Sequence, residues 1–180
     1  MGTRSTTIIV TALLAMVVPL ILAPTPLNVG VDGHPGSSEK EGREGTSDVF
    51  EFRHTLTQPF DPATGLATGR RQHSPLAITK FVDKASPGLH KALASGETID
   101  TVVVDFYRID PAKRTEVKYY TITLTDARVV SVHTFMPTSF VPENESWRHM
   151  EQVSFVYGKI TWNWLPDGGI LVSDAWGNPP

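Results

Sequence analysis

The chain has 180 residues, a length that favours a single domain, and it carries a formal net charge of -3. No cluster of Lys and Arg exceeds a pair such as Arg70–Arg71, so the basic stripe typical of nucleic-acid-binding proteins is missing and we expect no nucleic-acid partner. The sequence contains no cysteine, which excludes disulfides, thiol catalysis, cysteine-ligated zinc or iron–sulfur sites and an acylated-cysteine membrane anchor.

An uncharged and mostly apolar stretch occupies residues 6–23, with Arg4 just before it. Its length reaches the lower limit of a membrane span, and a basic residue followed by apolar ones also suits a secretory signal. Pro24 directly after Ala23 makes a poor cleavage site, and a start codon placed too far upstream is a third interpretation. We therefore set apart residues 1–25 as an N-terminal segment and expect residues 26–180 to form the folded domain.

From residue 26 onward the pattern is mainly that of β-strands separated by turn residues. We predict eight strands, which cover residues 27–31, 49–57, 76–82, 99–109, 117–124, 127–135, 152–164 and 170–176. The fifth and sixth are bent or joined at residues 125–126, where we expect Asp126 to make a turn. The strand over 152–164 is apolar on both faces, so one face can fill a core and the other needs a cover, either a helix or another subunit.

One convincing helix is predicted between the third and fourth strands. We expect Ser86 to be its N-cap, Pro87 its first helical residue and Gly96 the residue just past its end. Between them Leu89 and Ala92, with the neighbouring Leu93, form a single apolar stripe that must pack on a sheet. The elements together predict an all-β fold, a barrel or sandwich with one short α-helix.

Loops separate several of these strands. Residues 34–47 are rich in Gly, Ser and charge, which predicts an exposed loop with disorder as an alternative, and residues 137–149 form another loop. Residues 59–71 form a long loop, and long ordered loops in compact domains are usually functional. We regard this loop as the best candidate for contacting a neighbouring subunit. The candidate contact residues in it are Phe60, Asp61, Thr68, Arg70 and Arg71.

A search for catalytic and metal-binding patterns is largely negative. The sequence has no G-x-S-x-G elbow, no H-E-x-x-H pair and no phosphate-binding loop, and its six histidines lack zinc-type spacing. Asp83 and Asp105 could in principle do acid–base work, but Asp83 more plausibly supports a helix start. Trp162 and Trp164 could stack on sugars or bases, but core or interface packing is the simpler interpretation. We expect no catalytic residue, cofactor or metal.

Several segments together resemble a known protein family. The segments are residues 73–80 (HSPLAITK), 83–89 (DKASPGL), 119–127 (YYTITLTDA), 151–162 (EQVSFVYGKITW), 168–169 and 174–176, with the loop of residues 61–71 leading into them. Their order and spacing are similar to those of Hcp, the haemolysin-coregulated protein, from about residue 27 to residue 176. The signature residues that we expect to have structural roles are His73, Pro75, Lys80, Asp83, Ser86, Pro87, Asp126, Glu151, Tyr157 and Trp162.

The resemblance implies a two-sheet β-barrel of about eight strands with a helix on its flank. It also implies a structural protein without catalytic residues, whose subunits form hexameric rings that stack into the hollow tube of a type VI secretion system. The implied partners are further copies of the chain and the sheath, spike and effector proteins of the secretion machine. Such a tube assembles in the cytoplasm and is then secreted.

The N-terminal segment departs from this family pattern, because tube subunits normally begin within a few residues of the first strand. A retained or exported segment at residues 6–23 would bring the chain to a membrane or out of the cytoplasm. The alternative function is therefore an exported or membrane-tethered binding module that keeps the Hcp-like fold without forming a tube.

Overall fold

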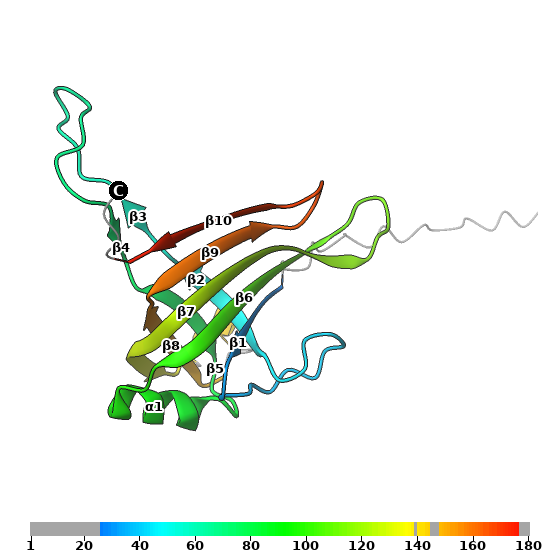
Figure 1. Ribbon diagram of the computed structural model, residues 1–180. Helices are drawn as coiled ribbons and strands as arrows, with labels where there is room; N and C mark the ends of the chain where they lie inside the picture. The colour runs from blue at the N-terminus through cyan, green and yellow to red at the C-terminus, as the bar shows by residue number, and fades with distance from the viewer. Residues whose placement is uncertain (1–25, 139, 145–147, 177–180) are drawn as a thin grey trace, which may run out of the picture.

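The computed structural model describes residues 26–138, 140–144 and 148–176 (Figure 1). The N-terminal segment, with its signal, anchor and start-codon interpretations, lies outside the described residues. None of the helices in the described part of the chain is long and apolar enough to cross a membrane. The elements are β1 (Leu27–Val31), β2 (Ser47–Arg53), β3 (Leu56–Thr57), β4 (Gln72–His73), β5 (Leu76–Phe81), α1 (Ser86–Ser95), β6 (Ile99–Ile109), β7 (Glu116–Phe135), the 3₁₀ turn Pro142–Asn144, β8 (Met150–Val156), β9 (Lys159–Trp164) and β10 (Ile170–Ala175).

Eight of the strands form one sheet in the order β10-β9-β7-β6-β1-β2-β5-β8, and β7 also pairs with β8, which closes a barrel. The long β7 makes this possible because its first half pairs with β9 and its second half with β8. β9 and β10 therefore extend the sheet beyond the closed barrel, as Figure 1 shows. The mainly β fold with one flanking helix is the one predicted from the sequence.

The barrel core follows the two-residue alternation of its strands. Val29 on β1, Val104 on β6 and Leu124 on β7 point inward and are at most 1% exposed, with Phe155 of β8 beside them. The helix α1 lies against one end of the barrel and contributes Leu89, which is fully buried (Figure 1). One continuous apolar core therefore holds the sheet and the helix together.

The helix begins differently from the prediction. Ala85, not Ser86, is the N-cap residue, and no side chain caps the helix. The Ser86 hydroxyl instead donates to Glu151 Oε1 at 2.8 Å, because a buried carboxylate lies within its reach. The other end is as predicted, since Gly96 has φ 67° and is the left-handed C-cap.

The predicted strand over residues 152–164 is wrong as a single element. The chain runs beside β7 throughout, but it breaks at Tyr157 and Gly158 into β8 and β9. Opposite the break Asp126 has φ 53°, and the Gly158 amide donates to the carbonyl oxygens of Thr125 and Asp126 at 3.0 and 3.2 Å. A Cβ on residue 158 would lie 3.2 Å from the Asp126 Cβ, so glycine allows both strands to bend at one point. The two strands predicted at 117–124 and 127–135 are joined here into β7.

The first loop is more ordered than the composition suggests. Most of residues 34–46 are exposed or half-buried, but Arg43 is only 6% exposed and donates to Asn28 Oδ1 at 2.9 Å. Its guanidinium lies 3.6 Å from the centre of the Tyr107 ring and also pairs with Glu116. The prediction of an exposed loop is therefore wrong at Arg43, because one buried cation anchors the loop to the barrel wall.

Candidate assembly surfaces

The first candidate surface is the extension of the sheet beyond the barrel. Ile170 and Val172 of β10 lie directly opposite Trp164 and Trp162 of β9, so all four side chains share the face that continues the core. Ile170 is 66% exposed and Val172 is 53% exposed. Leu171, on the other face of β10, is 66% exposed. We call the face formed by Trp162, Trp164, Ile170 and Val172 the shelf.

The shelf also ends in an open strand edge. Within the described residues β10 pairs only with β9, and it is the last strand in the order of the sheet. An edge strand leaves backbone N–H and C=O groups that can pair with another chain. An exposed apolar face next to an open edge is typical of an interaction surface.

A cation lies beside the shelf. The Arg108 guanidinium lies 5.0 Å from the centre of the Tyr119 ring and 5.3 Å from that of the Trp164 ring. Its Nε is buried and has no hydrogen-bond partner in the described part of the chain. The guanidinium, flanked by two aromatic rings, is suited to pair with a carboxylate of another molecule through its terminal N–H groups.

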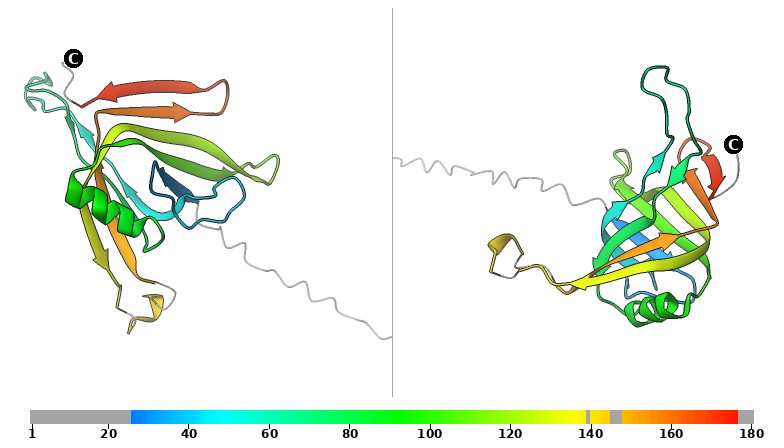
Figure 2. Two further views of the ribbon diagram at one scale, coloured as in Figure 1. Left: turned by 60° about the horizontal axis from the view of Figure 1, so that its bottom comes forward. Right: turned by 90° about the vertical axis from the view of Figure 1, so that its left-hand side faces the viewer.

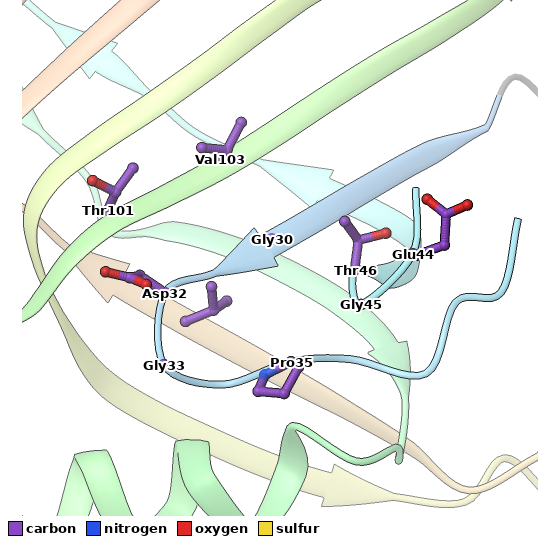
Figure 3. A pocket seen from close by; sticks show the side chains of 10 residues that line it. Gly30, Asp32, Gly33, Pro35, Glu44, Gly45, Thr46, Thr101 and Val103 are labelled. Atoms are coloured by element: carbon purple, nitrogen blue, oxygen red, sulfur yellow. The ribbon is translucent and has the colours of Figure 1, made fainter. Parts of the chain in front are cut away.

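The second candidate surface is a hollow on the outer side of β1 and β6. Gly30 lies opposite Val103, and both point away from the core because their neighbours Val29, Val102 and Val104 are buried in it. An open hollow of about 610 Å³ lies above this floor, beside the loop after β1. Figure 3 shows Asp32 and Glu44 at the rim of the hollow. The hollow is therefore open and acidic at its edge.

The third candidate surface is the long loop, which is an ordered hairpin. β3 pairs with β4, and Phe60 forms a bridge with Ala67 farther out. Figure 2 shows the hairpin extending away from the barrel. Asp61 holds the tip in shape, since Oδ1 accepts from the Ala63 amide at 2.9 Å and Oδ2 from the Thr64 hydroxyl at 3.0 Å. The hydrogen bond from the Ala63 amide is also the main reason that the pKa of Asp61 is lowered.

The hairpin tip is apolar and open to solvent. Phe60 is 62% exposed, and the neighbouring Leu66 is 68% exposed. Thr68 donates its amide to the Pro59 carbonyl at 3.0 Å, which keeps the two arms of the hairpin together. Arg70 is exposed, whereas Arg71 points back and donates to both carboxylate oxygens of Asp174 through its Nε and Nη2 groups. Of the five predicted contact residues, Phe60, Thr68 and Arg70 are therefore exposed on the hairpin, whereas Asp61 and Arg71 are engaged within the chain.

A polar network ties the base of the hairpin to the barrel. The Tyr157 hydroxyl lies 2.7 Å from His54 Nε2 and 2.8 Å from His73 Nδ1. His73 Nε2 lies 3.1 Å from Asp174 Oδ2, and Arg71 pairs with the same carboxylate. The Arg71 hydrogen bond is the main reason that the pKa of Asp174 is lowered, and burial raises the pKa of Tyr157. We call these five residues the latch.

A buried charge cluster fixes the start of the helix. The fully buried Lys80 ammonium lies 2.6 Å from Asp83 Oδ1 and 2.8 Å from Glu151 Oε1. Ser86 bonds to Glu151, as described above, and Pro87 follows it in the first turn of α1. Three signature residues that are close in sequence therefore meet the distant Glu151 at one point, where β5, β8 and α1 join.

The remaining signature residues lie at other structural positions. His73 and Tyr157 belong to the latch, Asp126 is at the bend of β7, and Trp162 is on the shelf. Pro75 lies exposed between β4 and β5. The described residues contain no group of three or more His, Cys, Asp or Glu that could hold a metal ion.

Sequence reasoning missed Arg108 and His54. Arg108 is the one basic residue of the strand over residues 99–109, next to Phe106 and Tyr107, and this position is the only signal that could have marked it. His54 gave no signal, because its partner Tyr157 is 103 positions away.

Comparison with known proteins identifies the family. The model of the family described as "Type VI secretion system effector, Hcp" matches residues 29–164. The chain belongs to the Hcp family. It is 41% identical over 144 residues to the "Major exported protein" of Pseudomonas aeruginosa, an alignment that covers 80% of this chain and 83% of that protein.

Solved structures of Hcp proteins show the same fold. The Hcp1 protein of E. coli EAEC 042 has a TM-score of 0.71 and 37% identity, and the match covers 85% of this chain and 98% of that one. The secreted protein Hcp3 of Pseudomonas aeruginosa has a TM-score of 0.65 and 32% identity, with 86% and 99% covered. The match to almost the full length of both Hcp structures makes the barrel described here an Hcp barrel.

Proposed function

We propose that this chain is a structural subunit of a type VI secretion tube, which self-assembles into rings and is exported. The observation that carries this proposal is the shelf, an apolar sheet face with an open strand edge that no described part of the chain covers. Membership of the Hcp family and the similarity to a protein named for its export support the same function. The role is structural rather than catalytic.

The ring contact is proposed to join two different surfaces of the same chain. The shelf of one copy would lie over the hollow on β1 and β6 of the next copy. The charges of the two surfaces are complementary, because Arg108 lies beside the shelf while Asp32 and Glu44 lie at the rim of the hollow. A contact between two different patches is heterologous, and it produces a closed ring when the rotation from copy to copy closes. A hexamer is the ring size that the family resemblance implies.

Rings are proposed to stack through the long hairpin. The hairpin extends away from the barrel (Figure 2). Two of its apolar side chains, Phe60 and Leu66, are more than half exposed to solvent. Its shape is fixed by its own hydrogen bonds, so docking on another ring would cost little conformational entropy. The tube so formed would meet the sheath, spike and effector proteins of the machine and would be secreted after assembly in the cytoplasm.

The apolar stretch at residues 6–23 favours a second candidate, an exported or membrane-tethered binding module with the same barrel. In that case the shelf would bind another protein, and the mature chain would begin near residue 24 or stay with the membrane. Mass spectrometry of the N-terminus of the protein isolated from its cells separates the two candidates. Cleavage near Ala23 or membrane retention supports the binding module.

A charge on the shelf tests the ring proposal. We expect Val172→Lys to abolish rings, because it places an ammonium group in the apolar contact. Val130→Lys is the matched control, since Val130 is a similarly exposed strand valine (43% against 53%) outside the shelf. The measurement is negative-stain electron microscopy with gel filtration of residues 24–180, without and with each substitution. A parent protein that stays monomeric at high concentration would refute the proposal.

A further inference from the structure

The latch joins two of the surfaces on which the proposed assembly depends. It ties the base of the long hairpin, through His54, His73 and Arg71, to Tyr157 at the break between β8 and β9 and to Asp174 on β10. The strands of the hairpin are only two residues each, so these side chains are a large part of what holds it to the barrel. Trp176 adds to this, because its ring stacks on His73 with centres 5.4 Å apart.

The hydrogen bonds of the latch allow only certain proton arrangements. His73 Nε2 faces the Asp174 carboxylate, so this nitrogen carries a proton. A neutral His73 then accepts the Tyr157 proton at Nδ1, and the Tyr157 oxygen accepts a proton from His54 Nε2. Every polar group in the chain of contacts is satisfied in this state.

One additional proton fits the latch. When His73 takes a proton on Nδ1, it donates to the Tyr157 oxygen, and the tyrosine turns its own proton toward His54 Nε2. His54 accepts there as the other neutral tautomer, with its own proton on Nδ1 instead of Nε2. The new positive charge faces Asp174, which Arg71 also contacts. The hydrogen bonds reverse direction and none is lost.

A second proton does not fit. With both imidazoles charged, His54 Nε2 and His73 Nδ1 both donate to the tyrosine oxygen, and the Tyr157 proton loses its acceptor. The two charged rings lie 6.3 Å apart, and the third ring near His54 is the neutral Trp162. The single carboxylate in the network, Asp174, is already shared by Arg71 and His73. In the described part of the chain both influences on the His54 pKa lower it from 6.5, burial first and then the nearby His73.

We propose that the latch is a pH switch: protonation of His54 together with His73 releases the long hairpin from Tyr157 and β10. The direction of the pH effect follows from the pKa of His54 in the released hairpin and in the closed latch. In the released hairpin His54 is exposed and takes up a proton near pH 6.5, whereas in the closed latch it does so only at lower pH. The released state therefore gains relative to the closed one as the pH falls below about 6.5. Release of the hairpin and of β10 should also weaken the tube, and only this part rests on the proposed function.

The switch is tested first on the monomer, in the Val172→Lys background, so that contacts between copies do not contribute. Hydrogen exchange of the amides of residues 55–74 is measured at pH 7.5 and pH 5.5 and expressed as protection factors, which removes the intrinsic effect of pH on exchange. We expect protection to fall by up to about tenfold at pH 5.5, because this pH lies about one unit below the value of 6.5 at which a released imidazole takes up its proton.

Three variants show whether the latch causes the loss of hydrogen-exchange protection at pH 5.5. His54→Gln keeps a donor toward Tyr157 but cannot be charged, so its protection should not depend on pH. Tyr157→Phe removes the shared hydroxyl and should give low protection at both values. His133→Gln, which changes an exposed histidine on β7, should behave like the parent. A parent that keeps its protection at pH 5.5, or a His54→Gln variant that loses it equally, would overturn the proposal.

Assembly is then compared by gel filtration of the protein with Val172 intact. We expect fewer rings at pH 5.5 than at pH 7.5, and rings at both values for His54→Gln. Rings that are equally abundant at both values while the hairpin opens would overturn the link to assembly. If no rings form at any pH but the hairpin still opens at pH 5.5, the proposed tube function is wrong and the switch stands.

Discussion

Lys80 is fully buried, and its ammonium group contacts two carboxylates, Asp83 and Glu151. Removing the lysine would leave both carboxylates buried without a cation. We therefore expect Lys80→Met to lower the free energy of unfolding by about 3–5 kcal/mol, the usual cost of breaking a buried ion pair. Urea unfolding, followed by the fluorescence of the tryptophans in the monomeric Val172→Lys background, measures the change.

The matched control for this change is Lys40→Met. Lys40 also pairs with a carboxylate, Asp48 at 3.3 Å, but its side chain is 53% exposed. We expect it to cost less than about 1 kcal/mol, because water screens an exposed pair. Equal costs for the two substitutions would show that the buried cluster does not hold the helix to the barrel.

How far single residues can be predicted depends on where their partners lie. Gly96 as a helix end followed from local sequence, because the left-handed C-cap is a short-range requirement. The role of Ser86 did not, since its hydroxyl is held by Glu151, 65 positions away, and a local capping rule cannot see that partner. Family resemblance marked Lys80, Asp83 and Glu151 as signature residues, but only the pairing of β5 with β8 shows that they meet.

At the scale of elements, strand periodicity predicted where the chain is extended but not where it breaks. β6 spans the predicted residues 99–109, because its first half alternates regularly and the strand continues past the register shift at Phe106 and Tyr107. The break between β8 and β9 was missed, since apolar side chains continue through it and the cause, the bend of β7 at Asp126, is on another strand. Periodicity predicted an apolar face in need of a cover, but not the exposed shelf. Its exposure depends on the position of β9 and β10 at the end of the sheet, which periodicity does not predict.

The long hairpin can be tested as an element. Replacing residues 60–69 by a short Gly-Ser link should leave the barrel folded, because the hairpin lies outside the core and the latch residues are kept. We expect rings that no longer stack into tubes, which electron microscopy shows directly. The matched control shortens the turn between β6 and β7 at residues 111–114, another exposed hairpin end, and should leave tubes intact. Tubes of normal length without residues 60–69 would exclude the hairpin from stacking.

At the scale of the whole molecule, the proposed ring contact makes assembly depend on salt and on charge. If Arg108 of one copy meets Asp32 or Glu44 of the next, the protein concentration needed for rings should rise with ionic strength. Arg108→Gln should raise that concentration by about tenfold or more. The reason is that it removes one partner of a partly buried, charge-assisted contact. Arg148→Gln is the control, since Arg148 is an exposed arginine over the Phe81 ring, away from the shelf. Sedimentation velocity across a concentration series measures both effects.

An exchange of charges decides whether these particular surfaces meet. Arg108→Glu alone should abolish rings, because it places a third carboxylate against the acidic rim of the hollow. Combining it with Asp32→Lys and Glu44→Lys in the same chain reverses both surfaces at once, so complementarity returns in every contact of a closed ring. Restored rings would require shelf and hollow to be opposite sides of one heterologous contact. If Arg108→Glu abolishes rings and the triple variant does not restore them, Arg108 contributes to assembly through some surface other than the hollow.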